Sequence, residues 1–292
     1  MSAGGRNGGA MSDVHKQVVR HYSHGGLLER IIEGLEALGK PLDALTHEDL
    51  APADEFHSQG RAATRALAEL GEIPRDARVL DVGSGLGGSA RYLAATYGCD
   101  VTGIDLTPEF CEVATELSQR VGMADRTRFR VGDALALPFE AGAFDLVWTI
   151  QMQMNIPDKA RLYGEIARVL RSGGRFVCQE VCAGNGEPLE FPVPWATDPA
   201  DSHLVSPHEM RTLIAAAGLR ETAWADFTAE AAAWRKAQVA RMSAPDAAPA
   251  TAPPLGIQLV LGPDAKSKLA NSGLNAERGR IRSVKGVFDK PA

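Results

Sequence analysis

A glycine-rich segment at residues 79–90, VLDVGSGLGGSA, combines an apolar run, an acid and a burst of small residues. A loop of this composition leaves a strand, enters a helix and binds a nucleotide. Gly83, Gly85 and Gly88 match the spacing G-x-G-x-x-G. With Gly87 in place of Gly88, the spacing is G-x-G-x-G. The glycines therefore predict a nucleotide site and leave its ligand open.

Asp81, two residues before Gly83 on the expected strand, separates the candidate nucleotides by charge. A dinucleotide such as NAD brings a pyrophosphate to this loop, and a nearby carboxylate would repel it. S-adenosylmethionine brings no phosphate, and its ammonium and sulfonium groups are both cationic. A carboxylate at the end of the first strand therefore favours S-adenosylmethionine through charge-assisted contacts.

Two further acids follow the next two expected strands. Asp105, in GIDLT, lies twenty residues after Gly85 and can accept both ribose hydroxyls, a role that NAD would also use. Asp133 can accept a hydrogen bond from the adenine amino group, and Ala134 leaves room for the flat ring. Each acid alone is an ordinary turn or cap residue. Their order at successive strand ends favours a cofactor site over an empty scaffold.

Alternating strands and helices must position these residues. Strands are expected at 78–82, 100–104, 127–131, 144–149, 175–181, 219–227 and 281–289, and helices within 14–38 and at 58–70, 88–97, 108–121, 158–170, 207–217, 229–241 and 265–280. Such alternation predicts a parallel sheet covered by helices on both faces.

Composition bounds the class of protein. The chain has 292 residues, of which 45% are hydrophobic, and a formal net charge of -6 with no long basic block. It can bury a large core, and nucleic acid is not an expected partner. No apolar run approaches the length of a membrane span. The four cysteines read as reduced thiols of a cytoplasmic protein.

The expected organisation has three parts. Residues 1–11 read as a disordered tail, so that Met11 is an alternative start; residues 12–72 form a helical lid; and residues 73–292 form the main domain. Acceptor-side insertions are expected at 183–205 and 228–280, the second of which includes a proline- and alanine-rich linker.

Four motifs in order, VLDVGSGLGG, GIDLT, GDALALPFEAGAFDLVW and ARVLRSGGRFV, resemble those of class I S-adenosylmethionine-dependent methyltransferases. The resemblance covers residues 78–182. It implies an α/β, Rossmann-like, doubly wound sheet of about seven strands, the last antiparallel. The closest likeness is to the small-molecule branch that contains sarcosine/dimethylglycine, phosphoethanolamine and ubiquinone/menaquinone methyltransferases.

The same resemblance assigns residues to the cofactor and the acceptor. HYSHGG and FHSQGRAAT resemble lid elements of that branch. The cofactor contacts that it implies, beyond the glycines and acids above, are Tyr22, Gln59, Gly60, Leu106 and Ile150. Residues after the fourth strand, Met152, Gln153 and Asn155, would face the transferred methyl group.

The segment EFPVPWATDP, residues 190–199, is the expected acceptor loop. Its Trp195 either holds a planar or cationic acceptor or packs as part of a rigid connector. A base is needed only for an acceptor that must lose a proton, and the candidates are Tyr22, His57 and Glu180. Each of these also has an ordinary structural explanation.

The sequence thus predicts a methyltransferase that acts on a small molecule, with an amine nitrogen favoured and a phenol, quinol or other natural product as the O- or C-methylated alternative. An NAD-dependent oxidoreductase and a non-catalytic S-adenosylmethionine-binding protein are the alternatives of other classes. None of the seven histidines lies at zinc-ligand spacing, so no metal is expected. The expected assembly is a monomer or a homodimer.

Overall fold

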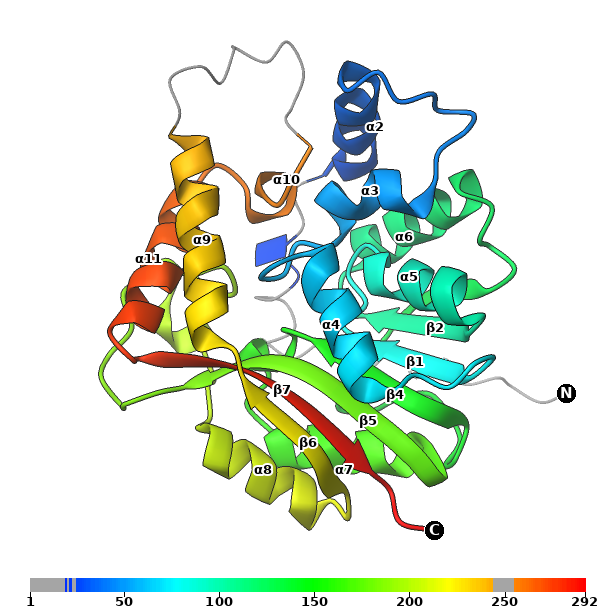
Figure 1. Cartoon of the computed structure of the whole chain (residues 1–292), viewed down its shortest axis with the longest axis vertical. Helices are drawn as coiled ribbons and strands as arrows, with labels where there is room; N and C mark the ends of the chain where they lie inside the picture. Colours follow the sequence, from blue (N-terminus) through cyan, green and yellow to red (C-terminus); the bar gives the residue numbers. More distant parts are fainter. Residues whose placement is uncertain (1–18, 20, 23–24, 244–254) are drawn as a thin grey trace, which may run out of the picture.

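The computed structural model describes residues 19, 21–22, 25–243 and 255–292 (Figure 1). The expected tail at 1–11, the start of the expected lid and residues 244–254 of the expected linker lie outside this part of the chain. Within it, no helix combines the length and the apolar character needed to cross a membrane.

One sheet of seven strands organises the fold. The strands are β1 (Arg78–Val82), β2 (Asp100–Asp105), β3 (Thr127–Val131), β4 (Phe144–Ile150), β5 (Leu170–Ala183), β6 (Arg220–Asp226) and β7 (Ile281–Asp289). Their order is β3-β2-β1-β4-β5-β7-β6. The pairs from β3 to β5 are parallel, and β7 runs antiparallel to both β5 and β6. The expected seven-stranded sheet with an antiparallel last strand is confirmed.

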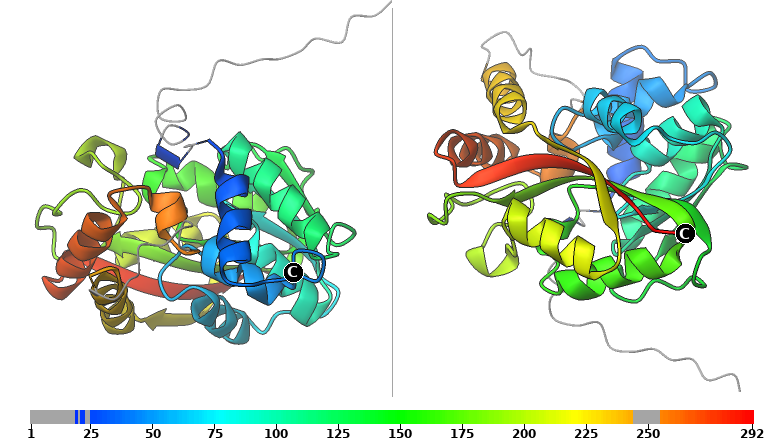
Figure 2. Two further views of the ribbon diagram at one scale, coloured as in Figure 1. Left: turned by 90° about the horizontal axis from the view of Figure 1, so that it is seen from above. Right: turned by 60° about the horizontal axis from the view of Figure 1, so that its bottom comes forward.

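Helices cover the sheet on both faces, as Figure 2 shows. They are α2 (Leu27–Ala37), α3 (His47–Asp54), α4 (Arg61–Gly71), α5 (Gly88–Tyr97), α6 (Pro108–Arg120), α7 (Lys159–Val169), α8 (Pro207–Ala216), α9 (Thr228–Met242), α10 (Gln258–Leu261) and α11 (Ala265–Glu277). α4 and α5 pack on one face, and α7 and α8 pack on the other. α4, which lies inside the expected lid, therefore belongs to the sheet layers.

Burial on both faces explains the composition of β1. Leu80 and Val82 pack into the core beneath α7 and α8, whereas Val79 packs beneath α4 and α5. Side chains alternate between the faces of a strand, so Asp81 shares its face with Val79. The Asp81 carboxyl group lies two residues before Gly83 and is buried.

A helical cap lies over the carboxyl ends of the strands. α2, α3, α6 and α10 share one hydrophobic core, and α10 also packs on α11, which lies beside α9 (Figures 1 and 2). α3 and α10 were not expected from the sequence. α3 contains Pro52 and few apolar residues, and begins instead at a capping box between Thr46 and Asp49. α10 is only four residues long.

Candidate active site

A cavity of about 250 Å³ opens at the carboxyl ends of β1, β2 and β4, where the strand order changes direction. Ligands of open α/β sheets bind at this position. Of the residues predicted from the sequence, the cavity is lined by Tyr22, His57, Asp81, Gly83, Gly85, Asp105, Leu106, Asp133, Ala134, Ile150, Met152, Asn155 and Trp195.

Three of the residues predicted to contact the cofactor or the acceptor do not line the cavity. Gln59 and Gly60, both at positive φ, form the turn before α4. Gln153 is a correction: its side chain is buried in the core, where Tyr163 Oη donates to its Oε1 and its Nε2 donates to Met210 Sδ at 3.4 Å. The backbone N–H of Gln153 also donates to Glu180 of β5 at 3.3 Å.

The glycine loop brings backbone close to its neighbours. Gly83 has a φ of 74°, and a Cβ there would lie 2.6 Å from Met152 Cβ. Gly85 has a φ of 51°, and a Cβ there would lie 2.8 Å from Phe56 Cζ. Any larger residue would therefore push the loop into the cavity or displace the cap. Glycine at these positions leaves the loop backbone exposed to a ligand.

Asp81 is the most unusual acid of the site. It is 2% exposed, and its Oδ2 has no hydrogen-bond partner among the described residues. Burial and the nearby Asp105 raise the pKa of Asp81 to about 8. A buried carboxylate without a partner is costly, so the site favours a ligand that brings positive charge to the end of β1.

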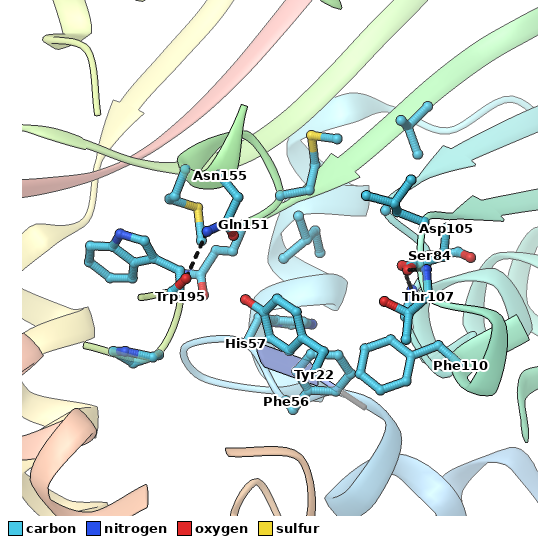
Figure 3. Close-up of a pocket in the computed structure, with 18 of the residues that line it drawn as sticks. Tyr22, Phe56, His57, Ser84, Asp105, Thr107, Phe110, Gln151, Asn155 and Trp195 are labelled. Atoms are coloured by element: carbon cyan, nitrogen blue, oxygen red, sulfur yellow. Dashed lines mark hydrogen bonds between the residues drawn. The ribbon is translucent and has the colours of Figure 1, made fainter. Parts of the chain in front are cut away.

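Asp105 is held in place by backbone donors. Its Oδ2 accepts from Gly85 N and its Oδ1 accepts from Thr107 N, both at 2.9 Å (Figure 3). Burial raises the pKa of Asp105, and these hydrogen bonds oppose the rise. Each carboxylate oxygen retains a second lone pair, so the group can still accept two donors from a ligand. Asp133, at the end of β3, accepts from Leu135 N at 2.8 Å.

Aromatic side chains of the cap close the cavity from above. Tyr22 and Phe56 pack on Phe110, with ring centroids 5.9 and 5.7 Å apart (Figure 3). Burial, followed by the charge of Asp105, raises the pKa of Tyr22 well above its usual value. The Tyr22 hydroxyl therefore keeps its proton and can donate a hydrogen bond, but it is not a base at neutral pH.

His57 enters the cavity on the loop between α3 and α4. Its Nε2 lies 3.2 Å from Thr64 Oγ1, which donates to Glu55 at 2.9 Å. Burial lowers the pKa of His57 to about 4, and the positive charges of Arg61 and Lys285 contribute to the lowering. The imidazole is therefore neutral at pH 7 and has an unprotonated nitrogen.

Glu180, the third candidate base, does not line the cavity. Its carboxylate accepts hydrogen bonds from Thr149 Oγ1 at 2.9 Å and from the backbone N–H of Met152 at 3.2 Å. Burial raises the pKa of Glu180 to about 7, while these bonds oppose the rise. Glu180 therefore orients the segment that carries Met152 rather than contacting a substrate.

Trp195 forms the wall opposite Asp105 and Ser84 (Figure 3). It is 2% exposed, and its Nε1 donates to Ser202 Oγ at 2.9 Å. Asn155 Nδ2 donates to the carbonyl of Trp195 at 2.7 Å. Trp195 thus packs in a core and also lines the cavity, and its contact with an acceptor stays a prediction.

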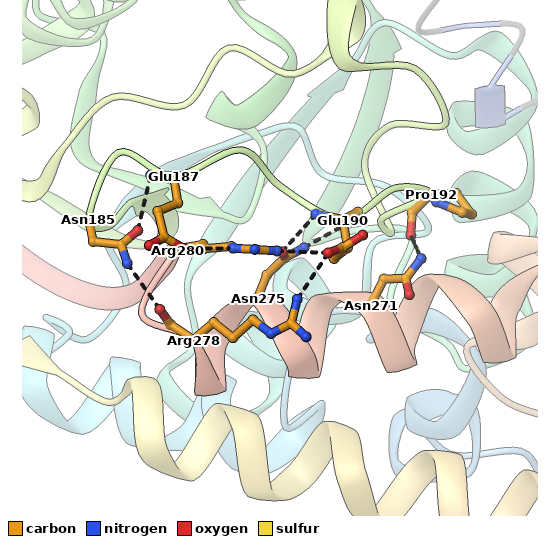
Figure 4. A network of polar contacts seen from close by, with 8 residues as sticks. All are labelled: Asn185, Glu187, Glu190, Pro192, Asn271, Asn275, Arg278 and Arg280. Atoms are coloured by element: carbon orange, nitrogen blue, oxygen red, sulfur yellow. Dashed lines mark hydrogen bonds and ion pairs between the residues drawn. The ribbon is translucent and has the colours of Figure 1, made fainter.

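The segment before Trp195 is attached to α11 (Figure 4). Asn275 exchanges two hydrogen bonds of 2.9 Å with the backbone of Glu190, and Asn271 donates to the carbonyl of Pro192 at 3.1 Å. Arg278 and Arg280 each donate to the Glu190 carboxylate at 3.0 Å. The loop and α11 therefore form one wall.

Several cavity residues were missed from the sequence. They are Phe56, Ser58, Gln151, Trp234 and Arg235 of α9, Ile257 and Leu261 near α10, and Leu269 and Ser272 of α11. The sequence places residues 228–280 on the acceptor side but does not single out individual residues there. The Trp234-Arg235 pair within an alanine-rich helix is the signal that could have pointed to cavity residues.

Comparison with known families decides what this domain is. Residues 80–178, from β1 to the middle of β5, match a family model described as a methyltransferase domain. The chain carries a methyltransferase domain. The matched segment includes Asp81, the glycine loop, Asp105 and Asp133, and the expected family is confirmed.

Curated relatives of this methyltransferase domain act on different acceptors according to their names. A probable tocopherol O-methyltransferase of rice (Oryza sativa subsp. japonica) is 40% identical over 148 residues, which are 49% of this chain and 41% of that protein. A sarcosine/dimethylglycine N-methyltransferase of Halorhodospira halochloris is 36% identical over 120 residues, which are 40% of this chain and 43% of that protein. The chain therefore spans less than half the length of these relatives.

The fold as a whole also has solved counterparts. The geranyl diphosphate C-methyltransferase of Streptomyces coelicolor matches with a TM-score of 0.70 and 19% identity, over 97% of this chain and 99% of that one. At this identity the likeness shows the fold alone. It extends beyond the methyltransferase domain to the cap and the C-terminal helices, because almost the whole chain is covered.

Among the residues that the structure describes, no three of histidine, cysteine, aspartate and glutamate are placed to hold an ion. All four cysteines, Cys99, Cys111, Cys178 and Cys182, are unpaired and buried. Metal-independent turnover stays a prediction.

Proposed function

We propose that the protein transfers the methyl group of S-adenosylmethionine to a small-molecule acceptor, at an amine nitrogen in the first instance. The observation that carries this proposal is the buried Asp81 carboxyl group, which stands beside the glycine loop and whose Oδ2 has no hydrogen-bond partner among the described residues. The ammonium group of S-adenosylmethionine would supply the missing positive charge. The pyrophosphate of NAD would instead add negative charge near Asp81 and Asp105.

The residues of the cavity fit the remaining parts of the cofactor. Asp105 would accept the ribose hydroxyls, Asp133 and Ala134 would bind the adenine, and Leu106 and Ile150 would pack against it. Tyr22 would donate to the methionine end from the cap. Bound there, S-adenosylmethionine supplies an electrophilic methyl group on a good leaving group. The protein then has to orient the acceptor and exclude water.

In the proposal, the cap excludes water, and the wall formed by the loop after β5, α9 and α11 orients the acceptor; we call this wall the C-terminal wall. Tyr22, Phe56 and Phe110 keep water from the cofactor. Met152 and Asn155 would align the acceptor against Trp195. The neutral imidazole of His57 could take a proton from the acceptor, although a pKa of about 4 makes it a weak base.

A phenol, quinol or other natural product, methylated at oxygen or carbon, is the second candidate acceptor. The apolar lining by Trp195, Trp234 and Ile257 favours it, because these residues would pack against a ring. A monomeric or homodimeric assembly and a cytoplasmic location belong to the same proposal.

Calorimetric titration tests the cofactor. S-adenosylhomocysteine should bind, and NAD should not. Asp105→Ala should weaken S-adenosylhomocysteine binding by roughly 1.5–3 kcal/mol, because a charged acceptor of hydroxyl donors is lost. NAD binding, or an unchanged affinity of Asp105→Ala, would contradict the cofactor assignment.

A methyl-transfer assay tests the acceptor. A panel of amines, phenols and quinols is incubated with S-adenosylmethionine, and methylated product is measured by mass spectrometry. Turnover restricted to amines would support the first candidate, and turnover restricted to phenols or quinols would support the second. Binding of S-adenosylhomocysteine without turnover of any acceptor would favour a non-catalytic protein.

A further inference from the structure

Arg235 of α9 is a buried charge that reaches the cavity from the C-terminal wall. It is 2% exposed and lines the cavity. Its Nη2 donates to Ser58 Oγ at 3.0 Å and to Ser283 Oγ at 3.4 Å. Its Nη1 has no hydrogen-bond partner among the described residues. Two neutral hydroxyls are therefore its only hydrogen-bond acceptors in the described part of the chain.

Within the described part of the chain, no carboxylate forms an ion pair with Arg235. Burial alone lowers the pKa of Arg235 to about 10, without an opposing contribution from any acidic group. By contrast, the equally buried Arg91 forms an ion pair with Asp54 at 2.8 Å. A buried guanidinium without a counter-ion costs several kcal/mol, roughly, in the folded state. Such a group is stable in the fold only if something offsets that cost.

The charges divide the cavity into two ends. Asp81, Asp105 and Asp133 line the end at the strands, where the proposed cofactor would bring its positive charges. Arg235 is the only lysine or arginine side chain that lines the described part of the cavity. A ligand that spans the cavity would therefore meet acids at one end and a cation at the other.

Two more donors of the cavity lack partners among the described residues. Ser272 of α11 is fully buried and its Oγ has no partner among the described residues, and the same is true of Gln151 Nε2. Both residues line the cavity. The Cβ of Arg235 is 3.8 Å from the Cβ position of Gly273, so the two helices place Arg235 beside Ser272. Gln151 is linked to Arg235 through Ser58, whose N–H donates to Gln151 Oε1 at 3.1 Å.

We propose that the methyl acceptor is an apolar molecule that carries a carboxylate, and that Arg235 binds this carboxylate with help from Ser272 and Gln151. The inference rests on the proposed function, because it assigns the acceptor of the same cavity. Arg235 would be a specificity-determining residue. The three groups are donors with unmet hydrogen bonds, and a carboxylate offers acceptors and a single negative charge to them.

The surroundings of Arg235 describe the rest of the acceptor. Trp234, Ile257, Leu261 and Leu269 line the cavity in the same region. They would pack against a hydrocarbon or aromatic body. A phosphate monoester would bring close to two negative charges to a single cation, so the charge balance favours a carboxylate.

Binding to matched ligand pairs tests this proposal without requiring turnover. The protein saturated with S-adenosylhomocysteine is titrated with benzoate, phenylacetate, indole-3-acetate and indole-3-propionate, and with the carboxamide of each. At least one carboxylate should bind about 10–100-fold more tightly than its amide, the range for a charge-assisted hydrogen-bonded pair. Arg235→Gln should lose this preference and keep its affinity for S-adenosylhomocysteine.

Arg241 provides a matched control. It lies on the same helix, is exposed and does not line the cavity, so Arg241→Gln should keep the preference. If Arg235→Gln does not fold, Ser272→Ala gives a second test and should weaken the carboxylate but not the amide. In the empty protein, Arg235→Met should unfold at the same temperature as wild type or higher, because it removes an uncompensated buried charge.

The outcomes separate this inference from the proposed function. Failure of the wild-type protein to bind S-adenosylhomocysteine would overturn both. If S-adenosylhomocysteine binds but no carboxylate exceeds its amide, or if Arg235→Gln retains the preference, the carboxylate assignment alone is wrong. Tighter binding of phenyl phosphate than of every carboxylate would also overturn it.

Discussion

At the scale of single residues, Asp81 and Arg235 stand out in the cavity, because each has a buried polar atom without a hydrogen-bond partner among the described residues. Asp81 and Arg235 are both buried and lack full compensation, and they lie in the same cavity. A fold retains such groups at a cost in stability, which a ligand of opposite charge offsets. By contrast, Glu180 and Gln153 are equally buried but form hydrogen bonds within the protein, and they have structural roles.

The raised pKa of Asp81 predicts a proton release on cofactor binding. With a pKa of about 8, Asp81 carries a proton at pH 7 in the empty protein. The ammonium of the ligand lowers that pKa, so binding expels the proton. Affinity for S-adenosylhomocysteine should then rise as the pH increases between about 6 and 8, by up to about tenfold per unit.

Calorimetry in two buffers of different ionisation enthalpy measures this release. Asp81→Asn is the matched variant, because it keeps the shape and has no proton to lose. It should bind more weakly and independently of pH in the same range. Equal pH dependence in wild type and Asp81→Asn would show that another group releases the proton.

At the scale of elements, the wall of the cavity that is proposed to bind the acceptor is assembled from segments far apart in the chain. The loop after β5 carries Trp195, and α11 holds that loop through Asn275 (Figure 4). α9 lies beside α11 and adds Arg235. The direction of Trp195 therefore depends on contacts that cross about eighty residues of sequence, such as the contact between Glu190 and Asn275.

Removing the attachment should loosen the loop. Asn275→Ala removes two hydrogen bonds from a fully buried position and should cost about 2–3 kcal/mol of unfolding free energy. Asn271→Ala removes one partly buried hydrogen bond and should cost less. Denaturant unfolding measures both, and hydrogen exchange should be faster at residues 185–199 in Asn275→Ala. A larger loss in Asn271→Ala would contradict this account.

Trp195 should influence the acceptor and not the cofactor. Trp195→Phe keeps an aromatic ring in the core and removes the donor to Ser202, which should cost about 1 kcal/mol of stability. The Michaelis constant of the acceptor should change, whereas the dissociation constant of S-adenosylhomocysteine should not. If the kinetic constants for the acceptor, corrected for the folded fraction, are unchanged, then Trp195 contributes only to packing.

At the scale of the whole molecule, the cavity lies between the sheet and a cap built from both ends of the chain. The N–H groups of Gly25 and Leu27 each donate to Glu109 of α6 at 3.2 Å, which holds the start of α2 over the second strand. α10 completes the cap by packing on α2. α6 also packs on β2 and β3 and so belongs to the sheet layers, whereas α2, α3 and α10 can move over it while the sheet stays rigid.

Ligand binding should therefore protect the cap more than the sheet. Hydrogen exchange is compared with and without S-adenosylhomocysteine. Amides of α2, α3 and α10 should gain protection, because the ligand joins the cap to the sheet, whereas those of β1 and β4 should change little. Equal protection of the cap in the two states would refute a movable lid.

The sequence by itself determined the sheet and the half of the cavity at the strand ends, where the cofactor is proposed to bind. β1, β3, β7 and α5 span the expected residues, and Gly83, Asp81 and Asp105 line the cavity as expected. Local rules suffice there, because a continuous apolar run, a glycine loop and an acid follow one another within a single strand–turn–helix unit, and parallel strands bring their carboxyl ends to one edge.

Only the tertiary structure decided the half of the cavity that α9 and α11 line, where the acceptor is proposed to bind. Nothing near Arg235 in the sequence shows that it is buried without a carboxylate, since its neighbours in space, Ser58 and Ser283, come from the two ends of the chain. Gln153 points to the core because its side-chain partners, Tyr163 of α7 and Met210 of α8, lie there. The physical reason is the same in both cases: burial and hydrogen-bond partners are set by packing between distant segments, which a local pattern of residue types does not specify.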